Sequence, residues 1–427
     1  MTQTASQSTV AGRFGKVRAR ARRAMSGTPG RMRVLARLAV VVTLLFALAA
    51  FSTFSSTDDA LRRGGANTSQ LVRIQAIHTN LVRADADATS AFLVGGVEPA
   101  GQRADFTSSL EQASRLIAEA ARAQPADGPA LGALNSSVLT YASLIEQARA
   151  TNRQALPVGA QYLRSASSGL RSEALPILGA LVVANDARVS AEFDGATGAA
   201  PLIAVGLLAL LVLVGGMVWL SLRTHRYVNV PLAAATAAVL VTLLAGTLAL
   251  AAVGSRVGQV RDGSYAATLA TATARIAAFD AKSNESLTLI ARGSGSAFEK
   301  AWVSSSKVVT VQSKASAALS PDAVGMDGLW AGYVGTHKKI READDAGRWE
   351  GAVTQAVGTG ANTANATFAA FDARSGAALT SSTRAASDSL EAPHVWLLLA
   401  AWLGLLAGVA AAALAWWGVS IRLEEYR

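Results

Sequence analysis

The sequence has no cysteine among its 427 residues, and its four histidines are scattered singly. The absence of cysteine excludes disulfide bonds, thiolate nucleophiles and cysteine-based zinc sites, and isolated histidines predict no metal cluster. Charged residues make up 16% of the chain, whereas a typical soluble domain has about 25%. These shortages disfavour an ordinary soluble enzyme, and we expect no catalytic residues, no metal and no cofactor.

Four apolar runs contain no charged residue, and each approaches or exceeds the ~20 residues that cross a bilayer core as a helix. They predict transmembrane helices over residues 38–54, 201–222, 230–253 and 394–421. Tryptophans near the ends of these runs are typical of membrane interfaces. A cleaved signal peptide is an alternative for the first run, because Ala47-Leu48-Ala49 resembles a cleavage site. The length of that run and of the basic segment before it favours a retained helix.

The net charge of +10 is concentrated beside the membrane ends. Residues 1–37 carry basic side chains and no acid, and so does the short loop 223–229, whereas the large segments 55–200 and 254–393 are nearly balanced. The positive-inside rule therefore predicts a multi-pass protein of the cell membrane, with both termini (1–37 and 422–427) and the loop in the cytoplasm. The basic composition is a topology signal and does not indicate nucleic-acid binding.

The basic head, residues 1–37, shows little periodicity and is predicted to be disordered. Basic residues near an anionic surface gain roughly 1 kcal/mol each, so we expect the head to lie against the lipid bilayer or an acidic partner. The candidate contacts with a cytoplasmic partner are arginines of the head and of the short loop: Arg18, Arg20, Arg22, Arg23, Arg223 and Arg226.

The second half of the sequence aligns on the first at an offset of 192. This register places Phe106 on Phe298, Leu110 on Trp302, Tyr141 on Tyr333 and Arg149 on Arg341. Small gaps bring Asp85 onto Asp280 at an offset of 195, and Asp186 onto Asp372 at an offset of 186. The pattern predicts an internal duplication in which each half is a span, a large outer segment and a second span.

The outer segments have a helical period. Leu71, His78 and Asp85 lie on one seam with steps of three and four residues, and Asp280 lies on the corresponding seam of the second half. Strand signals are absent. Gly and Pro breaks predict four helices in each half, at 56–94, 102–123, 130–155 and 158–198, then 254–292, 297–319, 323–345 and 349–390. We therefore expect an all-α membrane protein with four transmembrane helices and two extracytoplasmic up-down four-helix bundles.

Three polar residues on these seams, His78, Asp85 and Asp280, are candidate buried positions. An unpaired carboxylate on an apolar seam is costly. Either the aspartates shape a polar pocket or signalling contact, or they fix helix register through a hydrogen bond or an arginine pair, which we favour. For His78, a hydrogen-bonded core histidine is favoured over a pH switch.

A second group of candidates lies where each half returns to the membrane. These signal-coupling positions are Asp186, Arg188, Pro201, Asp372, Arg374 and Pro393. The charged members could carry a signal between bundle and membrane helix, although surface charge is the favoured interpretation. Gly404 and Gly408 form a Gly-x-x-x-Gly motif, which is typical of helix contacts and allows a homo-oligomer.

The sequence shows no intramembrane charge of the kind that marks a transport path, and no nucleophile–base pair. Large outer segments with a small cytoplasmic part favour a non-enzymatic receptor or adaptor that passes a signal to a separate cytoplasmic protein. A structural or accessory subunit of a transport or cell-envelope complex is the alternative. The ligand-binding residues are not predicted.

This plan of a basic head, two span–bundle–span units and a short basic loop resembles the GlnX family of actinobacterial membrane proteins. The resemblance implies two partners: an extracellular amino-acid-binding lipoprotein of the solute-binding type, and a cytoplasmic Ser/Thr kinase. The bundles separately resemble chemoreceptor sensor domains, although this chain lacks their linker domain and signalling hairpin.

Overall fold

The protein is all-helical in a computed structural model that describes residues 28–95, 98–154, 156–224, 229–391 and 395–424. No strand occurs within these ranges, which confirms the all-α class. Four helices are long and apolar enough to cross a membrane, as predicted. Six of the candidate positions fall outside the described ranges: Arg18, Arg20, Arg22, Arg23, Arg226 and Pro393.

The chain divides into two compact units. The span unit is formed by Met1–Leu61, Asp194–Arg256 and Pro393–Arg427, and the bundle unit by Arg62–Phe193 and Val257–Ala392. The span unit contains the apolar parts of four helices: α2 (Thr28–Val94), α7 (Ala200–Thr224), α8 (Val230–Val260) and α14 (Val395–Glu424). Both long helices α2 and α8 continue beyond the span unit along the chain.

Helix α2 begins at Thr28, ten residues before the predicted span. Residues 28–37 are therefore helical, so the disorder predicted for this part of the head is wrong, whereas residues 1–27 lie outside the described residues. Helix α7 begins at Ala200, so Pro201 lies in the first helical turn, where its missing N–H leaves no hydrogen bond unmade. This proline starts a new helix after the end of α6 (Leu175–Gly195).

Small residues allow close helix packing in the span unit. Gly404 and Gly408 of α14 are buried, and a Cβ added at Gly408 would lie 2.5 Å from the Cβ of Ala47 and 2.8 Å from its Cα. A Cβ added at Gly404 would lie 3.0 Å from the Cβ of Ala50. The glycine surface of α14 therefore packs on α2 of the same chain.

The first half of the bundle unit packs the later part of α2 against three further helical segments. These are α3 (Ala100–Ala123), α4 (Gly128–Arg153) and the run α5 (Val158–Gly169), η2 (Leu170–Ala174) and α6. The 3-10 turn η1 (Pro125–Asp127) joins α3 to α4. Buried residues recur every three or four positions, as along α3 from Phe106 to Ala120, and they meet in one apolar core around Ile74, Leu81 and Tyr141.

The second half has a similar order of helices, but its π turn lies before the first of them and not within the last helical run. It consists of η3 (Arg261–Tyr265), α9 (Ala266–Ile290), α10 (Ser296–Leu319), η4 (Pro321–Ala323), α11 (Met326–Asp345), α12 (Trp349–Val357) and α13 (Ala364–Glu391). The single helix predicted over 349–390 is wrong, because the chain leaves the helix at Gly358. It restarts after Thr363, whose hydroxyl accepts the N–H of Ala366 at 3.4 Å as an N-terminal cap does.

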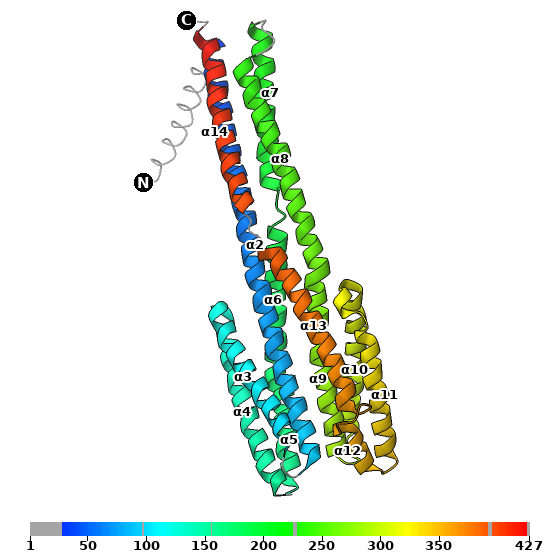
Figure 1. The fold of residues 1–427 in the computed structure, drawn as a ribbon. Helices are drawn as coiled ribbons and strands as arrows, with labels where there is room; N and C mark the ends of the chain where they lie inside the picture. Colours follow the sequence, from blue (N-terminus) through cyan, green and yellow to red (C-terminus); the bar gives the residue numbers. More distant parts are fainter. Residues whose placement is uncertain (1–27, 96–97, 155, 225–228, 392–394, 425–427) are drawn as a thin grey trace, which may run out of the picture. The chain divides into compact units, whose positions relative to one another are not determined.

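Both halves belong to one compact unit with two cores. Val82, Ala86 and Leu93 of α2 are part of the second half's core. In Figure 1, α3 and α4 lie on one side of this unit and α10 and α11 on the other, with α2, α6, α9 and α13 between them. Contact between the halves is therefore made by the central helices, a join that the sequence pattern did not predict.

The burial pattern relates the two halves at offsets that differ from one helix to the next. Phe106 and Trp302 take the first buried position of α3 and α10, which is an offset of 196 instead of the predicted 192. In α4 and α11, Tyr141 and Tyr333 keep the offset of 192. The Phe106–Tyr141 and Trp302–Tyr333 ring centroids lie 6.4 and 6.5 Å apart with interplanar angles of 38° and 39°. Trp302 thus packs where Phe106 packs, and the pairing of Trp302 with Leu110 is wrong by one helical turn.

Candidate functional site

Asp85 of α2 lies at the centre of the bundle unit and is 1% exposed. Its Oδ1 accepts hydrogen bonds from the hydroxyls of Ser167 (2.6 Å) and Tyr141 (3.4 Å). Its Oδ2 accepts one from Ser283 of α9 at 2.6 Å. Burial and the neighbouring carboxylate raise the pKa of Tyr141 well above its usual range, so Tyr141 stays protonated and can donate. The carboxylate is thus held by groups from both halves.

Arg171 joins Asp85 to Asp280, the two aspartates that the repeat placed at equivalent positions. Its Nη1 lies 3.1 Å from Asp85 Oδ2, and its Nε and Nη2 each lie 3.0 Å from Asp280 Oδ1. Nη2 also donates to Ser283 at 3.0 Å. Burial opposes the charge of Arg171, but the two carboxylates raise its pKa above the ordinary value. The arginine pair that we favoured for these aspartates is present, and one guanidinium serves both halves.

Asp280 differs from Asp85 in its surroundings. Its side chain is 23% exposed, and its Oδ2 accepts from Ser305 (2.6 Å) and from Asn284 (3.0 Å) one turn along α9. Asp85 is therefore the buried end of this network, and Asp280 is its more exposed end.

A second ion pair joins the halves through Asp372 of α13. Arg83 of α2 donates from Nη2 to both carboxylate oxygens, at 2.8 and 3.0 Å, and Nη2 of Arg275 lies 2.7 Å from Oδ1. The Arg83 guanidinium also lies 4.8 Å from the ring centroid of Phe279. Asp372 is therefore a contact between α2 and α13, and the favoured interpretation of a free surface charge is wrong for it.

The other predicted coupling residues have unlike partners. Asp186 accepts the hydroxyl of Tyr265 at 2.6 Å, which is a third contact between the halves. Arg188 binds the buried Asp127 at 2.8 Å within the first half, whereas Arg374 donates to the carbonyl of Val324. The Asp-Ala-Arg sequences of the two halves are thus not structurally equivalent.

Two of the polar contacts between the halves described above start from π-helical turns. Arg171 lies in η2 and Tyr265 in η3. A π turn holds more residues than an α turn, so it directs a side chain away from the face that the 3.6-residue period gives it, and such turns are frequent at functional sites. The sequence period alone could not have placed these two side chains at the contact.

His78 lies beside the Asp85–Arg171–Asp280 network on the same seam. Burial lowers the pKa of His78 to about 4, although the negative charge of Asp280 raises it in part. The imidazole is therefore neutral across the physiological range, which argues against the pH-switch interpretation.

A buried ionic cluster in the second half was missed by the sequence analysis. Glu285 is 1% exposed and accepts from Lys282 (3.0 Å) and from Nδ1 of His337 (2.8 Å), and Nε2 of His337 lies 3.2 Å from Glu299. The Trp302 ring stacks on His337 with centroids 3.5 Å apart. Burial opposes the charges, but Lys282 and His337 lower the pKa of Glu285, and the two glutamates raise that of His337. No group of side chains in the described ranges has a metal-binding geometry.

Asp87 gives a testable pH dependence. Burial raises its pKa to about 7, Arg83 and Lys282 lower it, and Asp105 and Asp372 raise it. Because the folded-state pKa exceeds the unfolded value of 3.8, the stabilisation is complete below about pH 4 and is lost as the pH rises through 7. We expect Asp87→Asn to raise the melting temperature relative to wild type at pH 8 and to have little effect at pH 4. Glu111→Gln, at an exposed position on α3, is the control; equal shifts at both pH values would contradict the assignment.

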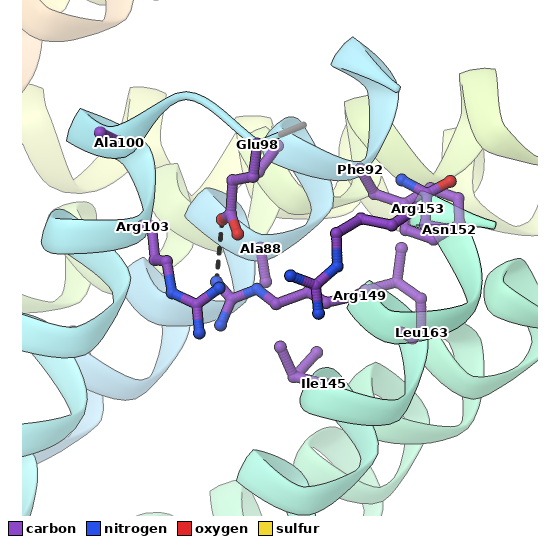
Figure 2. Close-up of a pocket in the computed structure, with 12 residues that line it drawn as sticks. Ala88, Phe92, Glu98, Ala100, Arg103, Ile145, Arg149, Asn152, Arg153 and Leu163 are labelled. Atoms are coloured by element: carbon purple, nitrogen blue, oxygen red, sulfur yellow. Dashed lines mark hydrogen bonds and ion pairs between the residues drawn. The ribbon is translucent and has the colours of Figure 1, made fainter. Parts of the chain in front are cut away.

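The first half also contains a cavity of about 230 Å³ at the end of the bundle where α2 stops. Its walls are apolar and include Ala88, Ile145 and Leu163. Figure 2 shows Arg103 of α3 and Arg149 and Arg153 of α4 pointing toward the same region, with Glu98 above them. Glu98 Oε1 binds Arg149 Nη2 at 2.9 Å.

Comparison with known proteins gives one match. Residues 60–194 match the family described as the Actinobacterial sensor domain, which is less than half of the chain. Neither curated proteins nor solved structures gave a significant match. The matched range covers the first half of the bundle unit, including Asp85, Arg171 and the cavity. The similarity and the four apolar helices support an actinobacterial sensor protein with several membrane-spanning helices, and they point to a non-catalytic role.

Proposed function

We propose that this protein is a non-enzymatic transmembrane receptor or adaptor that senses a ligand, or a ligand-loaded binding protein, outside the cell membrane. It passes the signal to a separate cytoplasmic partner. The observation that carries the proposal is the Arg171 guanidinium, which binds Asp85 of the first half and Asp280 of the second. A movement of either half therefore alters a charged contact of the other. A ligand that binds one arrangement of the two halves more tightly shifts the population of the protein toward that arrangement.

The partners follow from the resemblance to the GlnX family. We assign an extracellular solute-binding lipoprotein to the bundle unit and a cytoplasmic Ser/Thr kinase to the basic head and the loop, with Arg223 at the end of α7 and Arg226 as contacts. The Gly404–Gly408 surface is covered by α2 within the chain, so a homo-oligomer would use another surface.

This assignment requires the bundle unit to be outside the cell and both termini inside, as the positive-inside rule predicts. Because the chain has no cysteine, a single introduced thiol reports on its own position. We expect Ser136→Cys and Ser304→Cys, both at exposed positions of the bundle unit, to react with a membrane-impermeant thiol reagent on intact cells. Thr224→Cys is expected to react only after lysis. The opposite pattern would reverse the orientation and refute an extracellular sensing role.

The alternative function is a structural or accessory subunit of a transport or cell-envelope complex. Affinity purification from crosslinked membranes distinguishes the signalling function from this alternative. Recovery of a solute-binding lipoprotein together with a Ser/Thr kinase is expected for the signalling role. Recovery of transporter or envelope subunits without a kinase would favour the alternative. An Arg223→Gln variant serves as the matched comparison, since we expect it to weaken kinase recovery and leave lipoprotein recovery unchanged.

A further inference from the structure

The cavity of the first half combines an apolar interior with charged side chains. Ala88 and Ala91 of α2, Ile145 of α4 and Leu163 of α5 form its apolar wall. All but Ala91 belong to the first half's core cluster, so the wall is set by the packing of the bundle. The cavity volume of about 230 Å³ exceeds the roughly 150 Å³ that holds benzene and falls below the ~300 Å³ at which drug-sized sites begin. An occupant is therefore a small molecule with a short apolar part.

The charged residues of the cavity are not fully paired with one another. Arg149 is satisfied by Glu98 (2.9 Å), by Glu146 (2.7 Å) and by the Phe106 ring, 4.1 Å from its guanidinium. Within the part of the chain that the structure describes, the Arg103 guanidinium has a single ion-pair contact, with Glu146 at 3.5 Å. Among the described residues, Arg153 has no ion-pair partner. The cavity lining holds three arginines and one glutamate, with Glu146 outside it, and Arg103 and Arg153 are exposed at the edge of the cavity, so positive charge remains for an anionic group.

Glu98 supplies an acceptor beside these donors. Its Oε1 binds Arg149, whereas its Oε2 is buried and accepts no hydrogen bond from the described residues. A buried carboxylate oxygen without a donor costs free energy, and a ligand N–H or O–H would remove that cost. The close-up in Figure 2 places Glu98 next to the arginine side chains and over the apolar wall.

We propose that this cavity binds a small aliphatic carboxylate that carries a hydrogen-bond donor on the carbon next to the carboxylate, a 2-amino or 2-hydroxy acid. The carboxylate binds Arg103 and Arg153 through charge-assisted hydrogen bonds. The donor binds Glu98 Oε2, and the aliphatic side chain packs on Ala88, Ala91 and their neighbours. The role of this ligand as a signal rests on the proposed sensing function. Its binding does not, because binding can be measured without any signalling readout.

The test is calorimetric titration of the full chain in lipid nanodiscs with four probes of similar shape. L-Leucine and 2-hydroxyisocaproate are expected to bind. Isocaproate lacks the donor and is expected to bind at least about tenfold more weakly, as for loss of a hydrogen bond to a charged group. Isoamylamine lacks the carboxylate and is expected not to bind. Binding of L-leucine in preference to the hydroxy acid, or the reverse, identifies which of the two classes the site takes.

Matched variants locate the site. Arg153→Gln is expected to weaken binding of both acids at least about tenfold, and Glu98→Gln to remove the advantage over isocaproate. Arg115→Gln, at an exposed position on α3, is expected to leave binding unchanged. Ala100→Trp blocks the cavity mouth from an exposed position without altering the core, so it should abolish binding in a protein that still melts like wild type.

Three results would overturn the proposal: no binding of either acid to folded wild-type protein, equal binding of isocaproate, or unchanged binding in both Arg153→Gln and Ala100→Trp. Failure of the signalling role would leave these titrations unchanged, so the two proposals fail separately.

Discussion

Replacing Arg171 by methionine is expected to lower the free energy of unfolding of the bundle unit by about 3 kcal/mol, since removal of one partner from a buried ion pair leaves an uncompensated charge. The charge left behind is that of Asp85, which is 1% exposed and would keep only its hydroxyl donors. Loss of signalling is expected as well, because the direct charged link between Asp85 and Asp280 is gone. Thermal and denaturant unfolding of the purified full chain, with signalling output in cells, measures both effects.

A double-mutant cycle isolates the contact. Asp85→Asn removes the buried charge, so Arg171→Met should cost much less in the Asp85→Asn background than in wild type. Arg164→Met is the matched control: this arginine lies seven residues earlier on α5 and donates to Gln161 of its own helix. If Arg171→Met destabilises no more than Arg164→Met, Arg171 does not hold the halves together.

Substitution of Gly408 by leucine is expected to be the most damaging change in the span unit. The added Cβ would lie 2.5 Å from the Cβ and 2.8 Å from the Cα of Ala47. The collision involves the Cβ and the facing backbone, so no rotamer of the leucine relieves it and α14 must move away from α2. Overpacking of an interior usually costs about 1–3 kcal/mol and sometimes more, and we expect a loss at or above the upper end of that range.

The control for this change is Gly215→Leu on α7, where an added Cβ meets no other atom within 4 Å. Both variants add the same apolar side chain to an apolar helix. The melting temperature in detergent should fall for Gly408→Leu and stay near wild type for Gly215→Leu. Equal melting temperatures would show that α14 does not pack on α2 through this glycine.

The spans and the helical class could be predicted from the sequence because both depend on local patterns. Charge-free runs give the apolar helices, and steps of three and four residues give the buried seams. The position of Asp85 on such a seam also identified it as a buried carboxylate that needs an arginine or a hydrogen bond. The prediction missed the break between α12 and α13, where Gly358 and Gly360 lie in the interruption of the helix.

The partners of these residues could not be predicted in the same way. Asp85 and Ser283 are 198 residues apart in sequence, and no local period records such a contact. The cavity arginines come from two helices, and only packing brings Arg103 close to Arg153. The offset between the halves was wrong in α3 and α10 because a shift of four residues keeps the same helix face buried, so periodicity cannot distinguish the two registers.

The π turns η2 and η3 have a consequence for how relatives of this protein should be aligned. A single-residue deletion within 170–174 would convert the π turn to an α turn, so the flanking helices would keep their buried faces while the side chains within the turn would point in other directions. A relative with a one-residue gap at this place would therefore present a different side chain where Arg171 now meets Asp85, even if every other position matched. Such a gap would ordinarily be dismissed as length variation, but here it would separate chains that can form the bridge between the halves from chains that cannot.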